Sequence, residues 1–192
     1  MKDKIIGIDV DSVLADSDTV FTSELEKLTG RKLKRTADDP FKYEEAFGIS
    51  DKEMERFWED FTRRKGWLEI PPLKYGPETV KRLHEKYRII VVSARPKTIR
   101  KQTAGWLRKN GIPYDELLLT DFSDKTETFN DLNSLEYFLE DNADFAMAFA
   151  RKNIRVLLFD NPWNEGIVDK NITRVKDWKE VQKILFKSIR KR

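Results

Sequence analysis

Short apolar runs alternate with segments of helical spacing along most of the 192 residues. The runs are short and rich in β-branched residues or leucine, and they predict strands at 5–8, 88–92, 117–119, 135–139 and 155–159. The helical spacing between them predicts helices near 77–86, 96–110, 142–152 and 177–188. Strands that alternate with helices favour an α/β fold, a Rossmann-like parallel sheet of about five strands with helices on both faces.

One segment, residues 17–72, interrupts this alternation after the first strand. Its apolar spacing and caps predict three helices, near 20–29, 41–47 and 52–64, the last one capped by Ser50 or Asp51. We therefore expect a small helical cap at 17–72, inserted into a core formed by 1–16 and 73–192. Asp16 would open the insertion as a helix cap or turn residue.

The composition favours a soluble globular protein, with 39% hydrophobic and 37% charged residues. No apolar run approaches the roughly 18 residues of a membrane span, and residues 1–4 leave no room for a signal peptide before the first strand. The sequence has no cysteine, which excludes thiol catalysis, disulfides and thiolate metal sites. We expect a cytoplasmic location.

The charges are nearly balanced, with 37 basic and 34 acidic residues and a net charge of +3. This balance argues against a polymeric nucleic acid as partner, and the basic end at 187–192 reads as a frayed tail. Whether the chain forms a homo-oligomer is left open.

Polar residues follow the ends of the predicted strands: Asp9 and Asp11, Ser93, Asp121, Glu140 and Asp141, and Asp160. The carboxyl ends of parallel strands meet at one edge of a sheet, where ligands bind. Carboxylates gathered there from several strands need a cation, although an Asp-rich turn is the simpler explanation of Asp9 and Asp11 alone. Oxygen ligands favour Mg²⁺ over zinc, because the lone His84 is expected to be a surface or packing residue.

Two of these carboxylates are spaced for phosphoryl transfer. Asp9 could attack phosphorus as a nucleophile, and Asp11 could protonate the leaving alkoxide and then activate water. Ser93 could donate a hydrogen bond to a phosphate oxygen. Lys125, in a charged segment with a short predicted helix, could neutralise developing charge and keep Asp9 ionised.

Four segments resemble, in the same order, the motifs of the haloacid dehalogenase (HAD) superfamily of phosphohydrolases: Asp9 to Val13, Val91 to Ser93, Lys125, and Glu140 to Asp144. The resemblance covers most of the chain outside the insertion. It implies a nucleophilic Asp9 and an acid/base Asp11. It also implies magnesium held by Asp9, the carbonyl of Asp11, and Asp141.

Within the superfamily, the insertion and the segment Leu158 to Asn164 resemble the 5′(3′)-deoxyribonucleotidase group and its bacterial relatives. That group dephosphorylates nucleoside monophosphates. Two departures are Glu140, where an aspartate pair is common, and Arg95, which would add a cation near the phosphate. We therefore expect a magnesium-dependent phosphatase for a small phosphomonoester such as a (deoxy)nucleoside monophosphate. A sugar phosphate as substrate, or a catalytically silent binding domain, are the alternatives.

Aromatic residues in the insertion are candidates for binding a base. Trp58 and Trp67, flanked by charge or by Gly66, are expected to be partly exposed and to contact the substrate, because aromatic faces stack on bases. The alternative is that most of the aromatic residues form the core of the small helical cap.

Overall fold

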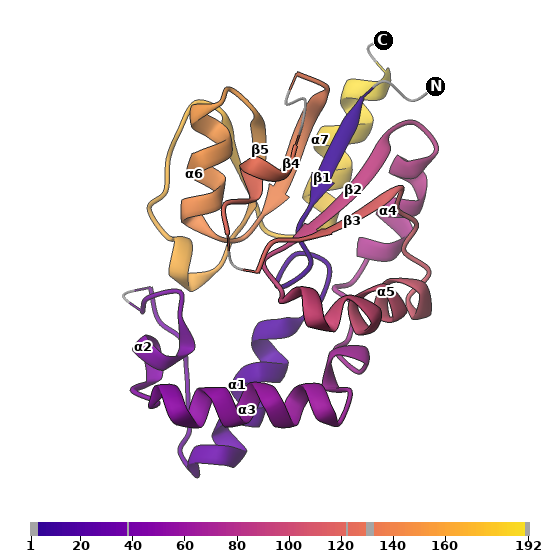
Figure 1. The fold of residues 1–192 in the computed structure, drawn as a ribbon. Coiled ribbons are helices and arrows are strands. Elements are labelled where there is room, and N and C mark those ends of the chain that lie inside the picture. Colours follow the sequence, from indigo (N-terminus) through magenta and orange to yellow (C-terminus); the bar gives the residue numbers. More distant parts are fainter. Residues whose placement is uncertain (1–3, 38, 122, 130–132, 191–192) are drawn as a thin grey trace.

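The computed structural model describes residues 4–37, 39–121, 123–129 and 133–190. Within these ranges, six strands form one parallel sheet in the order β3-β2-β1-β4-β5-β6 (Figure 1). They are β1 (Ile5–Ile8), β2 (Arg88–Ser93), β3 (Glu116–Leu119), β4 (Leu135–Glu140), β5 (Arg155–Phe159) and β6 (Ile172–Val175). The chain moves outward from β1 through β2 to β3 and then returns to place β4 on the other side of β1. The strand order therefore reverses between β1 and β4, the position at which open α/β sheets bind ligands.

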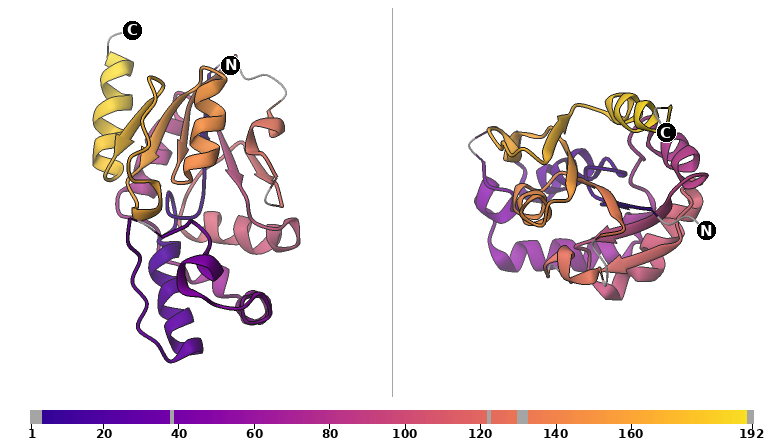
Figure 2. Two further views of the ribbon diagram at one scale, coloured as in Figure 1. Left: turned by 90° about the vertical axis from the view of Figure 1, so that its left-hand side faces the viewer. Right: turned by 90° about the horizontal axis from the view of Figure 1, so that it is seen from above.

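Helices cover both faces of the sheet, because successive strand residues point to opposite faces. One face packs against α4 (Gly76–His84), α5 (Arg100–Lys109) and α7 (Trp178–Arg190), through a core that includes Ile6 and Ile8. The other face, with Ile5 and Phe138, packs against α6 (Ala143–Arg151). Figure 2 shows α6 on the side of the sheet opposite α7. The predicted fold class is confirmed.

Strand β6 goes beyond the sequence prediction. Its sequence, Ile-Thr-Arg-Val, contains no apolar run, and its neighbour within the described sheet is β5 alone. A strand at the edge of a sheet needs fewer buried side chains than a central one, so the apolar pattern that identifies the other strands is weak here.

The helices of residues 17–72, the expected insertion, lie on the side of the sheet to which the strands point (Figure 1). They are α1 (Ser17–Thr29), α2 (Tyr43–Phe47), α3 (Asp51–Arg63) and the short 3₁₀ helix η1 (Gly66–Leu68). Ser50 caps α3 in a reciprocal capping box with Glu53, as the sequence predicts. Asp16 occupies the N-cap position of α1, but its side chain makes no capping hydrogen bond.

The two ends of the insertion are bound to each other. The backbone N–H of Asp16 donates to the carbonyl of Pro71 at 2.8 Å, and that of Leu73 donates to Leu14 at 2.7 Å. Residues 17–72 therefore leave and re-enter the core through two adjacent segments of chain. Among the described residues, no helix has both the length and the apolar character needed to cross a membrane.

The aromatic residues of the insertion form its own core. The ring of Phe21 is contacted edge-on by Tyr43, Phe57, Trp58, Phe61 and Trp67. Trp58 is half-buried, but the expected exposure of Trp67 is wrong, because this residue is only 5% exposed. A side chain at Gly66 would meet the Phe61 ring at 2.7 Å, so glycine lets the chain approach and turn Trp67 inward.

Candidate active site

Three carboxylates meet where the strand order reverses. Asp9 follows β1, Glu140 ends β4 and Asp141 comes next, and oxygen atoms of all three lie within 4.8 Å of one another. All three residues are buried. The residues after the outer strands differ: Asp121 pairs with Lys97 and Asp160 with Arg174, and both acids are exposed. The predicted cluster is therefore assembled from the two central strands.

Lys125 joins two of these carboxylates. It begins the short 3₁₀ helix η3 (Lys125–Thr128), and its buried Nζ lies 2.9 Å from Asp9 Oδ1 and 2.8 Å from Glu140 Oε2. The other oxygen of Glu140 accepts from the backbone N–H groups of Asp141 and Asn142, each at 3.1 Å. Glu140 thus holds Lys125 against Asp9 and fixes the start of the following turn.

The charges in this cluster do not balance. Burial raises the pKa of Asp9 to about 7, with Glu140 and Asp11 adding to the effect and Lys125 opposing it. Burial, together with Glu140 and Asp9, holds the pKa of Asp141 well above its usual range. Burial alone would lower the pKa of Lys125, but the charges of Asp9 and Glu140 raise it above its usual value. One lysine therefore faces three carboxylates, and the site has the donor set for a cation.

A tight turn after β1 places Asp11. The backbone N–H groups of Leu14 and Ala15 both donate to the carbonyl of Val10, at 2.9 and 2.8 Å, and Ser12 adopts a left-handed φ of 56°. Strand β1 ends at Ile8 and the turn follows, so the alternation of side chains along a strand does not determine the direction of Asp11.

The Arg95 guanidinium donates a hydrogen bond to each oxygen of the Asp11 carboxylate. Its Nε donates to Oδ2 at 2.8 Å and its Nη2 to Oδ1 at 2.7 Å, and the Ser17 hydroxyl donates to Oδ1 as well. Burial works to raise the pKa of Asp11, but the charge and hydrogen bonds of Arg95 outweigh it and hold that pKa below its usual value. The ionised form of Asp11 is therefore favoured, and Arg95 is its partner.

Trp67, a residue of the helical insertion, contacts Arg95 with its ring. The Arg95 guanidinium lies 4.6 Å from the centre of the Trp67 ring, and its Nη1 is 3.4 Å from the Thr103 hydroxyl. The buried Ser93 hydroxyl accepts from the Arg95 backbone N–H at 3.3 Å. The buried Trp67 ring thus packs against the Arg95 guanidinium.

Sequence reasoning used the segment after β5 as part of the family resemblance but gave Trp163 and Asn164 no role, and both contact Asp141. The indole N–H of Trp163 donates to Asp141 Oδ2 at 3.1 Å, and the Asn164 amide donates to the Asp141 carbonyl at 2.7 Å. The available signal was the polar sequence Asp-Asn-Pro-Trp-Asn directly after a strand end. His84, by contrast, pairs with Asp115 at the opposite edge of the sheet.

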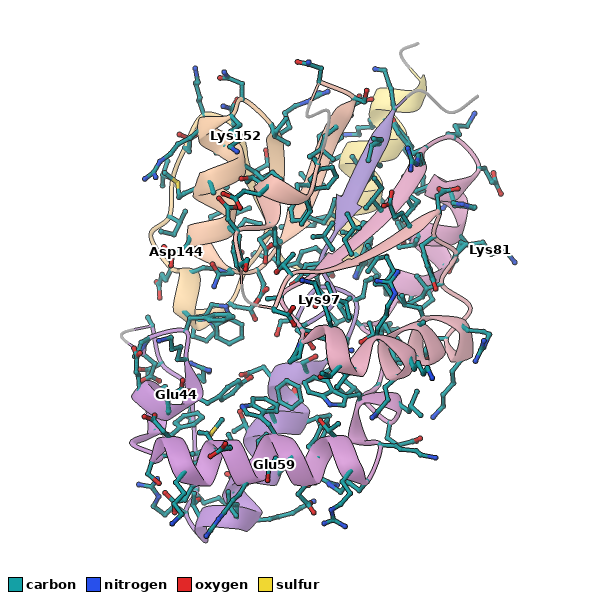
Figure 3. All side chains as sticks on the ribbon, in the orientation of Figure 1. Glu44, Glu59, Lys81, Lys97, Asp144 and Lys152 are labelled. Atoms are coloured by element: carbon teal, nitrogen blue, oxygen red, sulfur yellow. The ribbon has the colours of Figure 1, made fainter. Side chains whose placement is uncertain are left out.

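Core and insertion both contribute side chains to the region around these carboxylates. Figure 3 shows side chains extending between the two parts, with Asp144 and Lys97 on the core side and Glu44 on the insertion side.

Comparison with solved structures finds the same fold in other proteins. The fold matches a haloacid dehalogenase-like hydrolase of Streptococcus pneumoniae, SP0104, with a TM-score of 0.65 and 13% identity over 96% of this chain and 100% of the other. At this level of identity the likeness shows the fold, which is that of the HAD-like hydrolases.

Sequence comparison narrows the class. The chain is 26% identical to the protein YqfW of Bacillus subtilis over 178 residues, 91% of this chain and 90% of that protein. It is 34% identical to a nucleotidase of Clostridium acetobutylicum over 106 residues, 55% of each protein. The family model described as 5′ nucleotidase, deoxy (Pyrimidine), cytosolic type C protein matches residues 3–191. The chain belongs to this family, and it is a phosphoric monoester hydrolase of the 5′-nucleotidase type.

Proposed function

We propose that the protein is a magnesium-dependent phosphatase that hydrolyses a (deoxy)nucleoside monophosphate through an aspartyl-phosphate intermediate. The observation that carries the proposal is the buried Asp9 at the sheet's switch point, held by Lys125 and adjacent to Asp141. The family's description as a deoxynucleotide 5′-nucleotidase supports the substrate class.

The residues of the cluster fit a magnesium ion. Both oxygens of Glu140 already accept hydrogen bonds, from Lys125 and from two backbone N–H groups, so Asp9 and Asp141 are the better ligands. We propose that these two carboxylates and the carbonyl of Asp11 hold the ion. When bound, magnesium would offset the negative charges of the carboxylates and of a phosphate group.

Hydrolysis then takes place in two displacement steps at phosphorus, in which Asp9 and Asp11 have separate roles. In the first, a carboxylate oxygen of Asp9 forms a bond to phosphorus while the bond to the leaving oxygen breaks, and Asp11 gives that oxygen a proton. In the second, Asp11 accepts a proton from water as the water oxygen attacks phosphorus, which releases phosphate and the free Asp9 carboxylate. Lys125 keeps Asp9 oriented throughout, and Ser93 donates to a phosphate oxygen.

Arg95 must change partner for the first step, because an acid that donates a proton cannot stay paired as a carboxylate. A substrate phosphate is a competing partner of the same chemistry, since guanidinium groups bind carboxylates and phosphates in similar two-pronged geometries. We propose that Arg95 turns to the phosphate when the substrate binds, which leaves Asp11 able to hold a proton. Trp67 would support Arg95 from the insertion, and the half-buried Trp58 is the candidate to contact the base.

A panel of phosphomonoesters tests this function. With magnesium present, deoxynucleoside and ribonucleoside 5′-monophosphates should release phosphate with a kcat/KM at least about tenfold above that of sugar phosphates, the margin that about 1.4 kcal/mol of base contact supplies. Added alcohol should divert the same fraction of phosphate from every substrate, because all pass through one phosphoenzyme. A preference for sugar phosphates would reassign the substrate. No release from any member would leave a silent binding domain.

Magnesium binding should depend on pH in a defined direction. The pKa of Asp9 is raised from 3.8 to about 7, so in the metal-free fold its proton is retained up to that pH. The folded protein therefore favours the protonated form of Asp9. The stability that this preference contributes is present at low pH and is lost as the pH rises through about 7. Magnesium needs the ionised form and should bind about tenfold more weakly at pH 6 than at pH 8. Thermal shift titrations at the two pH values measure this difference.

The Asp9→Asn variant is the control for this titration, because it lacks the Asp9 carboxyl; the pH dependence that it keeps belongs to Asp141, whose pKa is also raised. Equal magnesium affinity of the unmodified protein at pH 6 and pH 8 would contradict the assignment of Asp9 as a ligand.

A further inference from the structure

Trp163 is a residue at which the helical insertion and the proposed metal site meet. Its indole N–H donates to Asp141 Oδ2 at 3.1 Å. Its ring lies 4.9 Å from the Arg35 guanidinium and meets the Phe41 ring edge-on, with centres 6.1 Å apart. Arg35 and Phe41 belong to the insertion, and Asp141 belongs to the core. One side chain therefore contacts both a carboxylate of the cluster and the part of the molecule that would cover it.

On the insertion side of this contact, Arg35 is held by several hydrogen bonds. Arg35 is only 9% exposed, and its guanidinium donates to the carbonyls of Pro40 and Phe41 at 2.6 and 2.8 Å and to Asp18 at 3.2 Å. The same group lies over the Tyr43 ring at 4.3 Å. Arg35 thus shapes the segment that carries Phe41, although the Phe41 side chain itself is 47% exposed.

The core side is equally fixed, through the residue that follows Trp163. The Asn164 amide donates to the carbonyls of Asp141 and Phe159, at 2.7 and 2.8 Å. Arg174 of β6 donates in turn to the backbone and side-chain oxygens of Asn164, at 2.7 and 3.0 Å. The backbone at Trp163 is therefore held in place relative to Asp141, and the indole has a defined direction.

We infer that Trp163 is a positioning residue for the metal ligand Asp141. Its N–H takes one carboxylate oxygen and leaves the other for the cation, and the contact with Arg35 and Phe41 makes this hold depend on where the insertion lies. Carboxylates that bind metals are usually held by hydrogen bonds of this kind, and losing one typically weakens metal binding about 10–100-fold. The inference rests on the proposed function for the metal site itself.

Substrate-free titrations of magnesium by calorimetry at pH 8 test the inference. Trp163→Phe keeps a ring beside Arg35 and Phe41 but lacks the N–H donor, and it should bind magnesium about tenfold more weakly than the unmodified protein. Its melting temperature without magnesium should stay close to that of the unmodified protein. Its kcat at saturating magnesium should recover, so that the loss appears in the magnesium dependence.

Two further variants separate the donor from the packing. Phe41→Ala keeps the indole N–H and the Arg35 contact but removes the Phe41 ring from Trp163, so it should weaken magnesium binding by a smaller factor. Trp163→His keeps a ring N–H and should recover part of the affinity lost in Trp163→Phe, which a purely structural role would not produce.

The outcomes distinguish the inference from the proposed function. If the unmodified protein binds magnesium and Trp163→Phe binds it equally well, the positioning role is wrong while the metal site stands. An unchanged affinity in Phe41→Ala would overturn the part of the inference that assigns a role to the Phe41 contact. If the unmodified protein binds no magnesium, the proposed metal site fails first.

Discussion

Replacing Asp9 with asparagine is expected to lower kcat by at least about 10⁴-fold, because an amide oxygen is a far weaker nucleophile than a carboxylate and no other residue occupies this position. The substitution preserves the shape of the side chain and removes one charge from a cluster in which a single lysine faces three carboxylates. Steady-state phosphate release, measured with the best substrate of the panel at saturating magnesium, gives the comparison.

Stability separates a chemical defect from a folding defect in this variant. Burial disfavours the charged form of Asp9, so Asp9→Asn should melt no lower than the unmodified protein when magnesium is absent at pH 8. Asp144→Asn is the matched control, because Asp144 is an exposed acid in the first turn of α6 (Figure 3), and it should keep its rate within about twofold. Substantial turnover by Asp9→Asn would rule out the aspartyl-phosphate mechanism.

Much of the cluster could be predicted because the carboxyl ends of parallel strands meet at one edge of the sheet. Central parallel strands are buried on both faces, so β1, β2 and β4 read as apolar runs whose ends are easily located. Residues that follow such runs fall on one edge whatever the details of packing, which brings Asp9 and Asp141 together. Lys125 stands in a charged segment away from the strand ends, and its place in the order of the motifs supports its assignment.

Contacts between distant segments escaped prediction for a physical reason. Arg95 and Asp11 are 84 residues apart, and their pairing depends on how a loop after β2 approaches a turn after β1. Trp163 contacts Asp141 through a loop whose shape is set by Arg174 on β6, the edge strand that has no apolar run. The local spacing of apolar and polar residues carries no information on either of these two contacts.

Losing Lys125 should damage both stability and turnover. Lys125→Met leaves the carboxylates of Asp9, Glu140 and Asp141 buried without their lysine, and removing one partner of a buried ion pair typically costs about 3–5 kcal/mol. Urea unfolding without magnesium measures this loss, and added magnesium should restore part of it, because the ion supplies the missing positive charge. At saturating magnesium kcat should still fall at least about 100-fold, since the charge that orients Asp9 is absent.

A double variant separates the two roles of Lys125. In Lys125→Met with Glu140→Gln, one carboxylate charge leaves along with the lysine, while the glutamine oxygen can still accept from the backbone N–H groups of Asp141 and Asn142. Much of the stability should return, because the cluster again carries the net charge of the unmodified protein. Turnover should stay low, since Asp9 still lacks its lysine. If the double variant recovers both stability and turnover, Lys125 supports the fold alone, and Asp9 is activated by the metal ligation that remains.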